Sequence, residues 1–166
     1  MSKGDQVEHA EIDPALFDKA QDDPKFQSIL ARGFDISYDY DVPYLGGYSV
    51  DGGTIYIDRD TPRSIMCRRR KIHLWPIGWV AGILTHEHWE KTAMIAYGWG
   101  YTKSHMLANR AEEHFVKTLL KATMGVYNAV WDPIVKAAEN KLRLREKLNL
   151  PPDLDHTPYS GTKLAA

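Results

Sequence analysis

The sequence predicts an α+β fold in which a small antiparallel sheet packs on a helical core. Between residues 34 and 60, aromatic and β-branched residues alternate with polar ones, whereas from residue 76 onward apolar residues recur at helical spacing. A chain of 166 residues suits one domain with a substantial core. We therefore expect a single domain over residues 11–150, a flexible N-terminal tail over 1–10 and an extended C-terminal tail over 151–166.

The composition and charge of the chain argue against several classes of protein. A formal net charge of -1 and a pI near 6.6 give no general attraction to nucleic acid or to an anionic membrane. The single cysteine, Cys67, excludes an internal disulfide framework and a thiolate zinc finger. Residues 1–12 are too polar for a secretory signal, and the apolar run Trp75–Leu84 is too short to cross a membrane. We expect a cytoplasmic protein with no membrane partner.

The first part of the chain is predicted to form short helices and then strands. Asp13-Pro14 suits the start of a helix, with Asp as the N-cap, and Asp23-Pro24 interrupts the amphipathic pattern that follows. Gly46-Gly47 and Asp51-Gly52-Gly53 are typical of turns between strands. The clearest strand is Thr54–Asp58, where Ile55 and Ile57 alternate with polar neighbours.

Three longer helices are predicted in the second part of the chain. Pro76 suits the first turn of a helix that runs to about Tyr97 and ends at Gly98 and Gly100. Further helices are expected over about residues 102–124, ended by Gly125, and over about 126–148.

The segment His86-Glu87-His88-Trp89-Glu90 in the first of these helices is one letter away from the H-E-x-x-H motif. Residues four apart lie on the same helical face, so His86 and Glu90 could reach one metal ion. Glu87 points to the side where the reacting water would lie. Imidazole and carboxylate are both ordinary zinc ligands, so the segment indicates a zinc site or a site for another divalent metal.

Ionisable residues interrupt the apolar faces of two neighbouring helices. One stripe consists of Trp79, Ile83, His86, Glu90, Ala93 and Tyr97. The other consists of His105, Ala108, Glu112, Phe115 and Leu119. A carboxylate on a core-facing stripe costs several kcal/mol unless it is paired or bound to metal. One metal site shared by the two helices explains both stripes, whereas His88 and His114 fall on other faces and are expected at the surface or its edge.

These residues resemble the zincin fold in a minimal, gluzincin-like form. The resemblance covers about residues 34–120 and rests on His86-Glu87-x-x-Glu90, the helix after it and the strand Thr54–Asp58 before it. It implies a small sheet, a helix with the metal motif and a second helix with a third ligand. By this resemblance His86 is the first ligand, Glu87 is the general base, and Thr54–Asp58 is the edge strand that binds an extended substrate.

The chain departs from the zincin pattern at Glu90, where the family has its second histidine. In gluzincins the third ligand is a glutamate on the following helix, a place that Glu112 fits. His105 lies on the same face two turns earlier, and with His86 and Glu90 it would restore the two-histidine, one-carboxylate set of catalytic zinc. Glu112 would then orient His105 or serve as a fourth ligand.

The resemblance implies a metallopeptidase-like hydrolase that acts on a peptide or protein substrate. Zinc polarises a carbonyl and lowers the pKa of its bound water, and Glu87 would carry the water's proton to the leaving amine. Tyr97 and Tyr101 are candidates for stabilising the oxyanion.

A non-catalytic binding or assembly protein that keeps the zincin-like fold is the main alternative. Its partner surface would consist of the third long helix and the tryptophans Trp75, Trp79, Trp89, Trp99 and Trp131. A nucleic-acid role would rest on the basic run Arg68–Lys71, which is more typical of a solvated loop. A di-iron carboxylate bundle requires E-x-x-H motifs, and the sequence has none.

Overall fold

The computed structural model shows an α+β architecture. It describes residues 14–42, 45–61, 65–67, 72–74, 76–144 and 147–159. Within these residues five α-helices accompany a small three-stranded sheet, which confirms the predicted fold class at this level. The predicted N-terminal tail and the basic run Arg68–Lys71 lie outside the described residues. Among the described helices, none is both long and apolar enough to cross a membrane.

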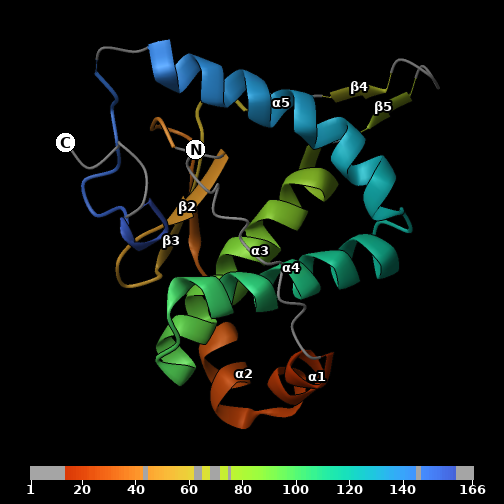
Figure 1. Ribbon diagram of the computed structural model, residues 1–166, viewed down its shortest axis with the longest axis vertical. Coiled ribbons are helices and arrows are strands. Elements are labelled where there is room, and N and C mark those ends of the chain that lie inside the picture. Colours follow the sequence, from red (N-terminus) through yellow and green to blue (C-terminus); the bar gives the residue numbers. More distant parts are fainter. Residues whose placement is uncertain are drawn as a thin grey trace, which may run out of the picture.

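The two short N-terminal helices, α1 (Pro14–Asp22) and α2 (Pro24–Leu30), meet at Asp23 as the sequence predicts. The Asp23 side chain accepts hydrogen bonds from the backbone amides of Lys25 and Phe26, so it caps the start of α2. Phe26 on α2 is fully buried. Both helices lie below the long helices α3 (Pro76–Tyr97) and α4 (Tyr101–Thr118) in Figure 1, at one end of the molecule.

The three-stranded sheet is mixed rather than antiparallel. It contains β1 (Asp35–Ser37), β2 (Gly46–Tyr48) and β3 (Thr54–Ile57) in the order β1-β3-β2. β3 pairs in parallel with β1 and antiparallel with β2, so β1 and β2 lie on opposite sides of β3. The expectation that Thr54–Asp58 is an edge strand is therefore wrong, since β3 is paired on both sides.

Gly46 and Gly47 belong to strand β2 and not to a turn. β2 lies against helix α3, and a Cβ atom on Gly46 would be 2.7 Å from Glu87 Oε1 and 2.9 Å from Ile83 Cγ2. Glycine is thus required here for the close approach of strand and helix. The predicted turn between β2 and β3 is confirmed, with Gly52 in the left-handed region at φ 75°.

Three long helices form the rest of the fold: α3 (Pro76–Tyr97), α4 (Tyr101–Thr118) and α5 (Met124–Leu144). Gly98, at φ 64°, allows the sharp turn between α3 and α4, which pack closely against each other. In Figure 1, α5 crosses the molecule at the end opposite to α1 and α2. Two further strands form a separate two-stranded antiparallel sheet: β4 (Ile65–Cys67) and β5 (Ile72–Leu74).

Helix α4 ends six residues earlier than predicted, at Thr118 rather than Met124. Lys121 has a φ of 50°, a left-handed conformation that a continuous α-helix cannot contain. Gly125 was expected to end this helix, but it lies in the first turn of α5. The earlier end of α4 leaves His105 and Glu112 within the helix.

The C-terminal segment, residues 151–159, packs on the domain instead of extending away from it. Leu154 is 2% exposed and forms a β-bridge with Ser49, just after β2. Asp155 forms an ion pair with Lys91 of α3, with 2.7 Å between Oδ2 and Nζ. The segment closes with a short 3-10 helix, η2 (Thr157–Tyr159). The described part of the expected C-terminal tail is therefore packed against β2 and α3.

The ion pair between Lys91 and Asp155 is expected to stabilise the fold. Burial would raise the pKa of Asp155, but hydrogen bonds from Lys91 and Thr157 outweigh it and hold this pKa below its usual range. Lys91→Met leaves the carboxylate without its cation and should lower the free energy of unfolding by about 3 kcal/mol at pH 7. Chemical denaturation measures this change.

The destabilisation should depend on pH in a defined direction. A carboxylate with a lowered folded-state pKa contributes stability above its unfolded pKa of about 3.9, and this contribution disappears as the pH falls through the folded value. The difference between wild type and Lys91→Met should therefore shrink in acid. The control is Lys117→Met, because Lys117 is 59% exposed and its pair with Glu113 should contribute less than about 1 kcal/mol. Equal losses from both substitutions would contradict this account.

Candidate metal centre

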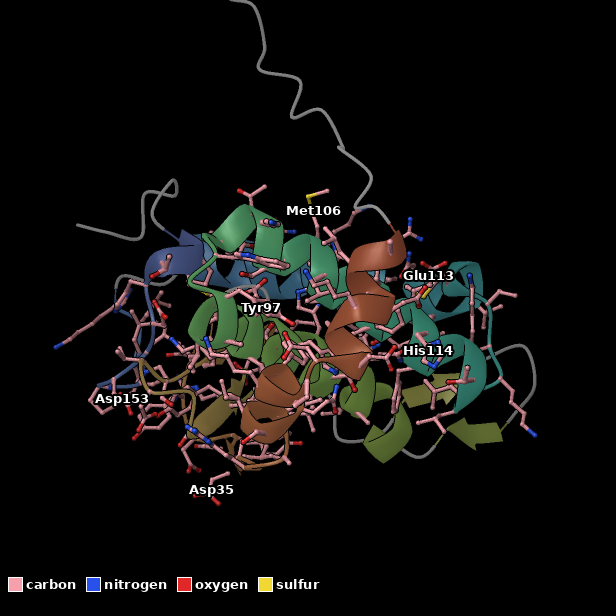
Figure 2. All side chains as sticks on the ribbon, turned by 90° about the horizontal axis from the view of Figure 1, so that it is seen from below. Asp35, Tyr97, Met106, Glu113, His114 and Asp153 are labelled. Atoms are coloured by element: carbon pink, nitrogen blue, oxygen red, sulfur yellow. The ribbon has the colours of Figure 1, made fainter. Side chains whose placement is uncertain are left out.

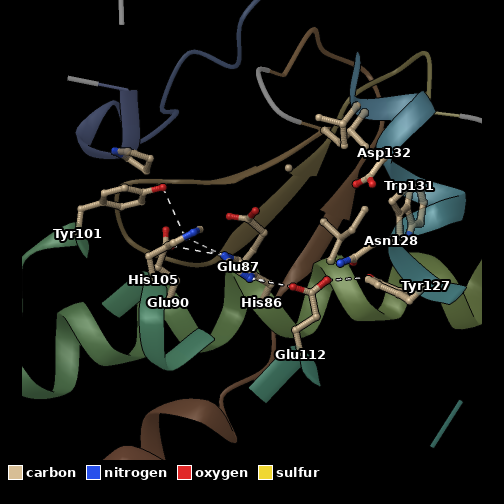
Figure 3. Close-up of a pocket in the computed structure, with 15 residues that line it drawn as sticks. His86, Glu87, Glu90, Tyr101, His105, Glu112, Tyr127, Asn128, Trp131 and Asp132 are labelled. Atoms are coloured by element: carbon tan, nitrogen blue, oxygen red, sulfur yellow. Dashed lines mark hydrogen bonds and ion pairs between the residues drawn. The ribbon is translucent and has the colours of Figure 1, made fainter. Parts of the chain in front are cut away.

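Helices α3 and α4 bring His86, Glu90 and His105 to one point. His105 Nδ1 lies 2.7 Å from Glu90 Oε2 and 3.0 Å from His86 Nε2. The third side of this triangle, from His86 Nε2 to Glu90 Oε2, is 3.6 Å. The turn at Gly98 positions the start of α4 beside the middle of α3, so residues 15 apart in sequence become neighbours. Figure 3 shows the three side chains meeting at the cavity.

The spacing of these three atoms fits a divalent metal. Zinc bonds of about 2.0–2.1 Å at tetrahedral angles place ligand atoms about 3.3 Å apart, close to the observed separations. Each of the three residues offers one ligand atom to this cluster, and all three atoms lie within 4.8 Å of one another. The Glu90 side chain is 2% exposed, whereas that of His105 is 39% exposed. A bound ion would therefore be held at the base of the cavity and be accessible from its open side.

Glu112 contacts His86 and not His105, which corrects the expected arrangement. Its Oε2 accepts a hydrogen bond from His86 Nδ1 at 3.0 Å, and its Oε1 accepts one from the Tyr127 hydroxyl at 2.7 Å. Both oxygens of Glu112 are thus hydrogen-bonded. Glu112 contacts Nδ1 of His86, whereas Glu90 lies near Nε2 of the same ring. A proton held on Nδ1 leaves Nε2 of His86 as the ligand atom.

Tyr127 reaches Glu112 because α3 has a glycine where α5 approaches it. A Cβ atom on Gly82 would lie 2.1 Å from the Tyr127 hydroxyl oxygen, so no larger residue leaves room for this side chain. Tyr127 itself is 2% exposed. Helix α5 thereby supports His86 through a chain of two hydrogen bonds.

A second tyrosine supports the carboxylate of the cluster. The Tyr48 hydroxyl donates to Glu90 Oε1 at 2.7 Å, which leaves Oε2 directed at the two imidazoles. Burial would raise the pKa of Glu90, but hydrogen bonds from His105 and His86 lower it to about 2. Glu90 is therefore ionised at neutral pH, as a metal-binding carboxylate must be.

Glu87 lies beside the cluster, in the wall of a cavity of about 490 Å³. Burial raises the pKa of Glu87 to about 8, with the cation on His86 opposing this effect and Glu90 and Glu112 adding to it. A carboxyl group with a pKa near neutrality can both take and give a proton. In Figure 3 its carboxylate points into the cavity between His105 and α5.

Of the two tyrosines expected to stabilise an oxyanion, only Tyr101 is at the cavity. Its hydroxyl lies 3.4 Å from His105 Nδ1. Tyr97 packs instead on Phe26 and Trp99, so its predicted role is wrong. Figure 2 shows Tyr97 among the side chains of α2 and α3.

The two other histidines of these helices lie away from the centre, as expected. His88 Nε2 is 2.8 Å from the carbonyl oxygen of Leu30, and its ring packs on Phe34 at the edge of the core. His114 is exposed on the outer side of α4, beside Phe17 of α1 (Figure 2). Neither side chain contributes to the cluster.

Several residues of the site were not predicted from the sequence. Tyr48 and Tyr127 have aromatic side chains that are typical of core packing, and nothing in their local pattern shows that each hydroxyl contacts a carboxylate. Asp132 and Pro158 line the cavity from segments far from the motif in sequence.

Comparison of the chain with protein-family models, curated proteins and solved structures gives no match.

Proposed function

We propose that this protein is a metal-dependent hydrolase, a zinc metallopeptidase-like enzyme in which His86, Glu90 and His105 hold the ion. The observation that carries the proposal is the triangle of ligand atoms, with sides of 2.7, 3.0 and 3.6 Å. Two imidazoles and one carboxylate form the ligand set of catalytic zinc, and the cavity leaves a further position open to water or substrate.

The chain's own residues can perform the remaining steps. A bound zinc ion would polarise the scissile carbonyl of the substrate and lower the pKa of a water molecule. Glu87 takes a proton from the attacking water and delivers it to the leaving nitrogen. The Tyr101 hydroxyl, at the cavity wall, can donate to the oxyanion that develops on the substrate. Glu112 and Tyr127 keep His86 in the orientation that binding requires.

Removal of the metal tests this function. Treatment with a chelator is expected to abolish hydrolysis of a mixture of synthetic peptides, and one equivalent of zinc is expected to restore it, because Glu87 alone cannot polarise the scissile carbonyl. Mass spectrometry of the peptide mixture detects the products. Hydrolysis that continues unchanged in chelator would contradict the proposal.

A non-catalytic protein is the second candidate, and one observation favours it. Burial alone would lower the pKa of His86, but hydrogen bonds to Glu112 and Glu90 raise it to about 10. The same residues therefore also form an internally paired ionic network, as a structural core would. Zinc binding without any turnover of peptides would support this alternative.

The hydrogen bond from Tyr127 should strengthen metal binding. Tyr127→Phe removes the hydroxyl, and Gly82→Ala displaces it, because the added Cβ atom would lie 2.1 Å from the hydroxyl oxygen. Each substitution should weaken zinc binding by about 10-fold or more, the effect usual for a group that orients a ligand. Competition with a zinc-binding dye measures the affinity.

The control for the glycine substitution is Gly100→Ala, since a Cβ atom on Gly100 would meet nothing within 4 Å. Its zinc affinity should equal that of the wild type. Unchanged affinity in both Tyr127→Phe and Gly82→Ala would show that α5 does not support the centre.

A further inference from the structure

We propose that the site takes the amino end of a peptide chain and releases its first residues, rather than cutting within an extended chain. This inference rests on the hydrolytic function proposed above and specifies its substrate. The observations that carry it are the closed outer edge of β2 and the distribution of charge around the cavity.

The outer edge of β2 is already occupied by the protein's own C-terminal segment. The Asp155 amide donates to the Tyr48 carbonyl at 2.8 Å, and the Val50 amide donates to the Asp153 carbonyl at 2.9 Å. An extended peptide binds a sheet edge through such backbone groups. Since the Tyr48 carbonyl and the Val50 amide are already hydrogen-bonded to the C-terminal segment, a long substrate cannot add a strand along this part of the edge.

The segment is held in place by buried contacts on both sides. Leu154 is 2% exposed and packs with Val42 and Tyr56 in a small apolar cluster. Asp155 pairs with Lys91 of α3, and the Tyr56 hydroxyl donates to the Asp153 carboxylate. The segment is therefore a fixed wall of the domain and not an exposed strand that substrate could displace at low cost.

This wall continues to the cavity. Beyond Asp155 the chain turns into η2, whose Pro158 lines the cavity together with Tyr101 and Gly46. In Figure 3, Glu87 and the residues of α5 face each other across the space that remains. The cavity is thus bounded on the side of η2 by Pro158.

The charge around the cavity selects the amino end. Glu87, Glu90, Glu112 and Asp132 line it, and no lysine or arginine is among the described lining residues. Asp132 projects from α5 toward the cavity, opposite Glu87 (Figure 3). A protonated α-amino group is attracted to the Asp132 carboxylate, whereas a terminal carboxylate would find no lysine or arginine side chain among the described lining residues.

The reaction is a simple hydrolysis. The C–N bond that follows the first residue or residues breaks, the oxygen of water bonds to the carbonyl carbon, and a proton is transferred to the leaving nitrogen. The products are a short fragment with a new carboxylate and a shortened peptide with a new amino end. No oxidant, reductant or other co-reactant is needed.

Two peptide mixtures test the inference with the zinc-loaded full-length protein. One is a set of synthetic hexapeptides that are randomised at the first three positions and have free amino ends, and the other is the same set N-acetylated. We expect removal of N-terminal residues from the free peptides, and at least about tenfold slower hydrolysis of the acetylated set. Mass spectrometry identifies the bond that is cut.

The outcomes separate this inference from the proposed function. Internal cuts, or equal rates for free and acetylated peptides, would overturn the amino-end preference and leave a metal-dependent hydrolase. Failure to cleave any peptide in either set would overturn both.

A substitution at Asp132 adds a second test. Asp132→Asn should reduce kcat/KM for free peptides by about fivefold, through KM, and leave hydrolysis of the acetylated set unchanged. Glu113→Gln is the matched control, because Glu113 lies on the outer side of α4 and pairs with Arg110 and Lys117 (Figure 2). Equal effects of Asp132→Asn on both sets of peptides would contradict a contact with the amino group.

Discussion

Replacement of Glu87 by glutamine is expected to lower kcat by about 10²- to 10⁴-fold while the protein still binds zinc. The amide has nearly the same shape as the carboxylate, but it cannot accept the proton of the attacking water. Glu87 contributes no ligand atom to the cluster of His86, Glu90 and His105, so the metal should remain bound. Peptide turnover and zinc content measured on the same preparation check both halves of this prediction.

Glu113 provides a matched control for the Glu87→Gln substitution. Glu113→Gln makes the same chemical change on the outer side of α4, where the carboxylate pairs with Arg110 and Lys117, and activity should be unchanged. Full activity in Glu87→Gln would show that Glu87 is not the general base. Loss of zinc from this variant would instead make Glu87 part of the metal-binding set.

The second large expected effect is the loss of zinc affinity when the third ligand, His105, is removed. His105→Ala should weaken zinc binding by far more than 100-fold, because it removes one of three atoms that contact the ion. Glu112→Ala should weaken binding by about 10- to 100-fold, since Glu112 acts through His86 Nδ1. Titration calorimetry on both variants gives the ranking.

A third histidine of the same helices provides the control for these titrations. His114 is exposed on the outer side of α4, and His114→Ala should bind zinc as the wild type does. If Glu112→Ala lost more affinity than His105→Ala, the ligand set would be His86, Glu90 and Glu112. His105 would then be available to contact the oxyanion.

The approach of His86, Glu90 and His105 could be predicted from the sequence because helical geometry is local. A spacing of four residues on a helix fixes His86 above Glu90, and the glycines after Tyr97 indicate a short turn into the next helix. Two adjacent helices with ionisable residues on their apolar faces have few ways to pack. The charge expected at the metal favours His105 over Glu112 as the third ligand, and the structure places His105 Nδ1 2.7 Å from Glu90 Oε2.

The surroundings of the cluster depend on contacts between distant segments, which local patterns do not encode. The sequence shows strands but not their order, so it did not indicate that β3 is central and β2 is the edge. Residues 151–159 contain two adjacent prolines and few apolar residues, a composition typical of a tail, yet Leu154 is buried beside Ser49. The Tyr127 contact depends on an opening at Gly82, 45 residues earlier in the chain.

The most direct test of the central claim is the X-ray absorption spectrum of the zinc-loaded protein at the zinc edge. The account predicts two imidazole nitrogens at about 2.0–2.1 Å and carboxylate or water oxygens at about 2.0–2.2 Å. One imidazole should disappear from the spectrum in His105→Ala if that protein still holds zinc. A shell of oxygen atoms without imidazole in the wild-type protein would contradict the proposed centre.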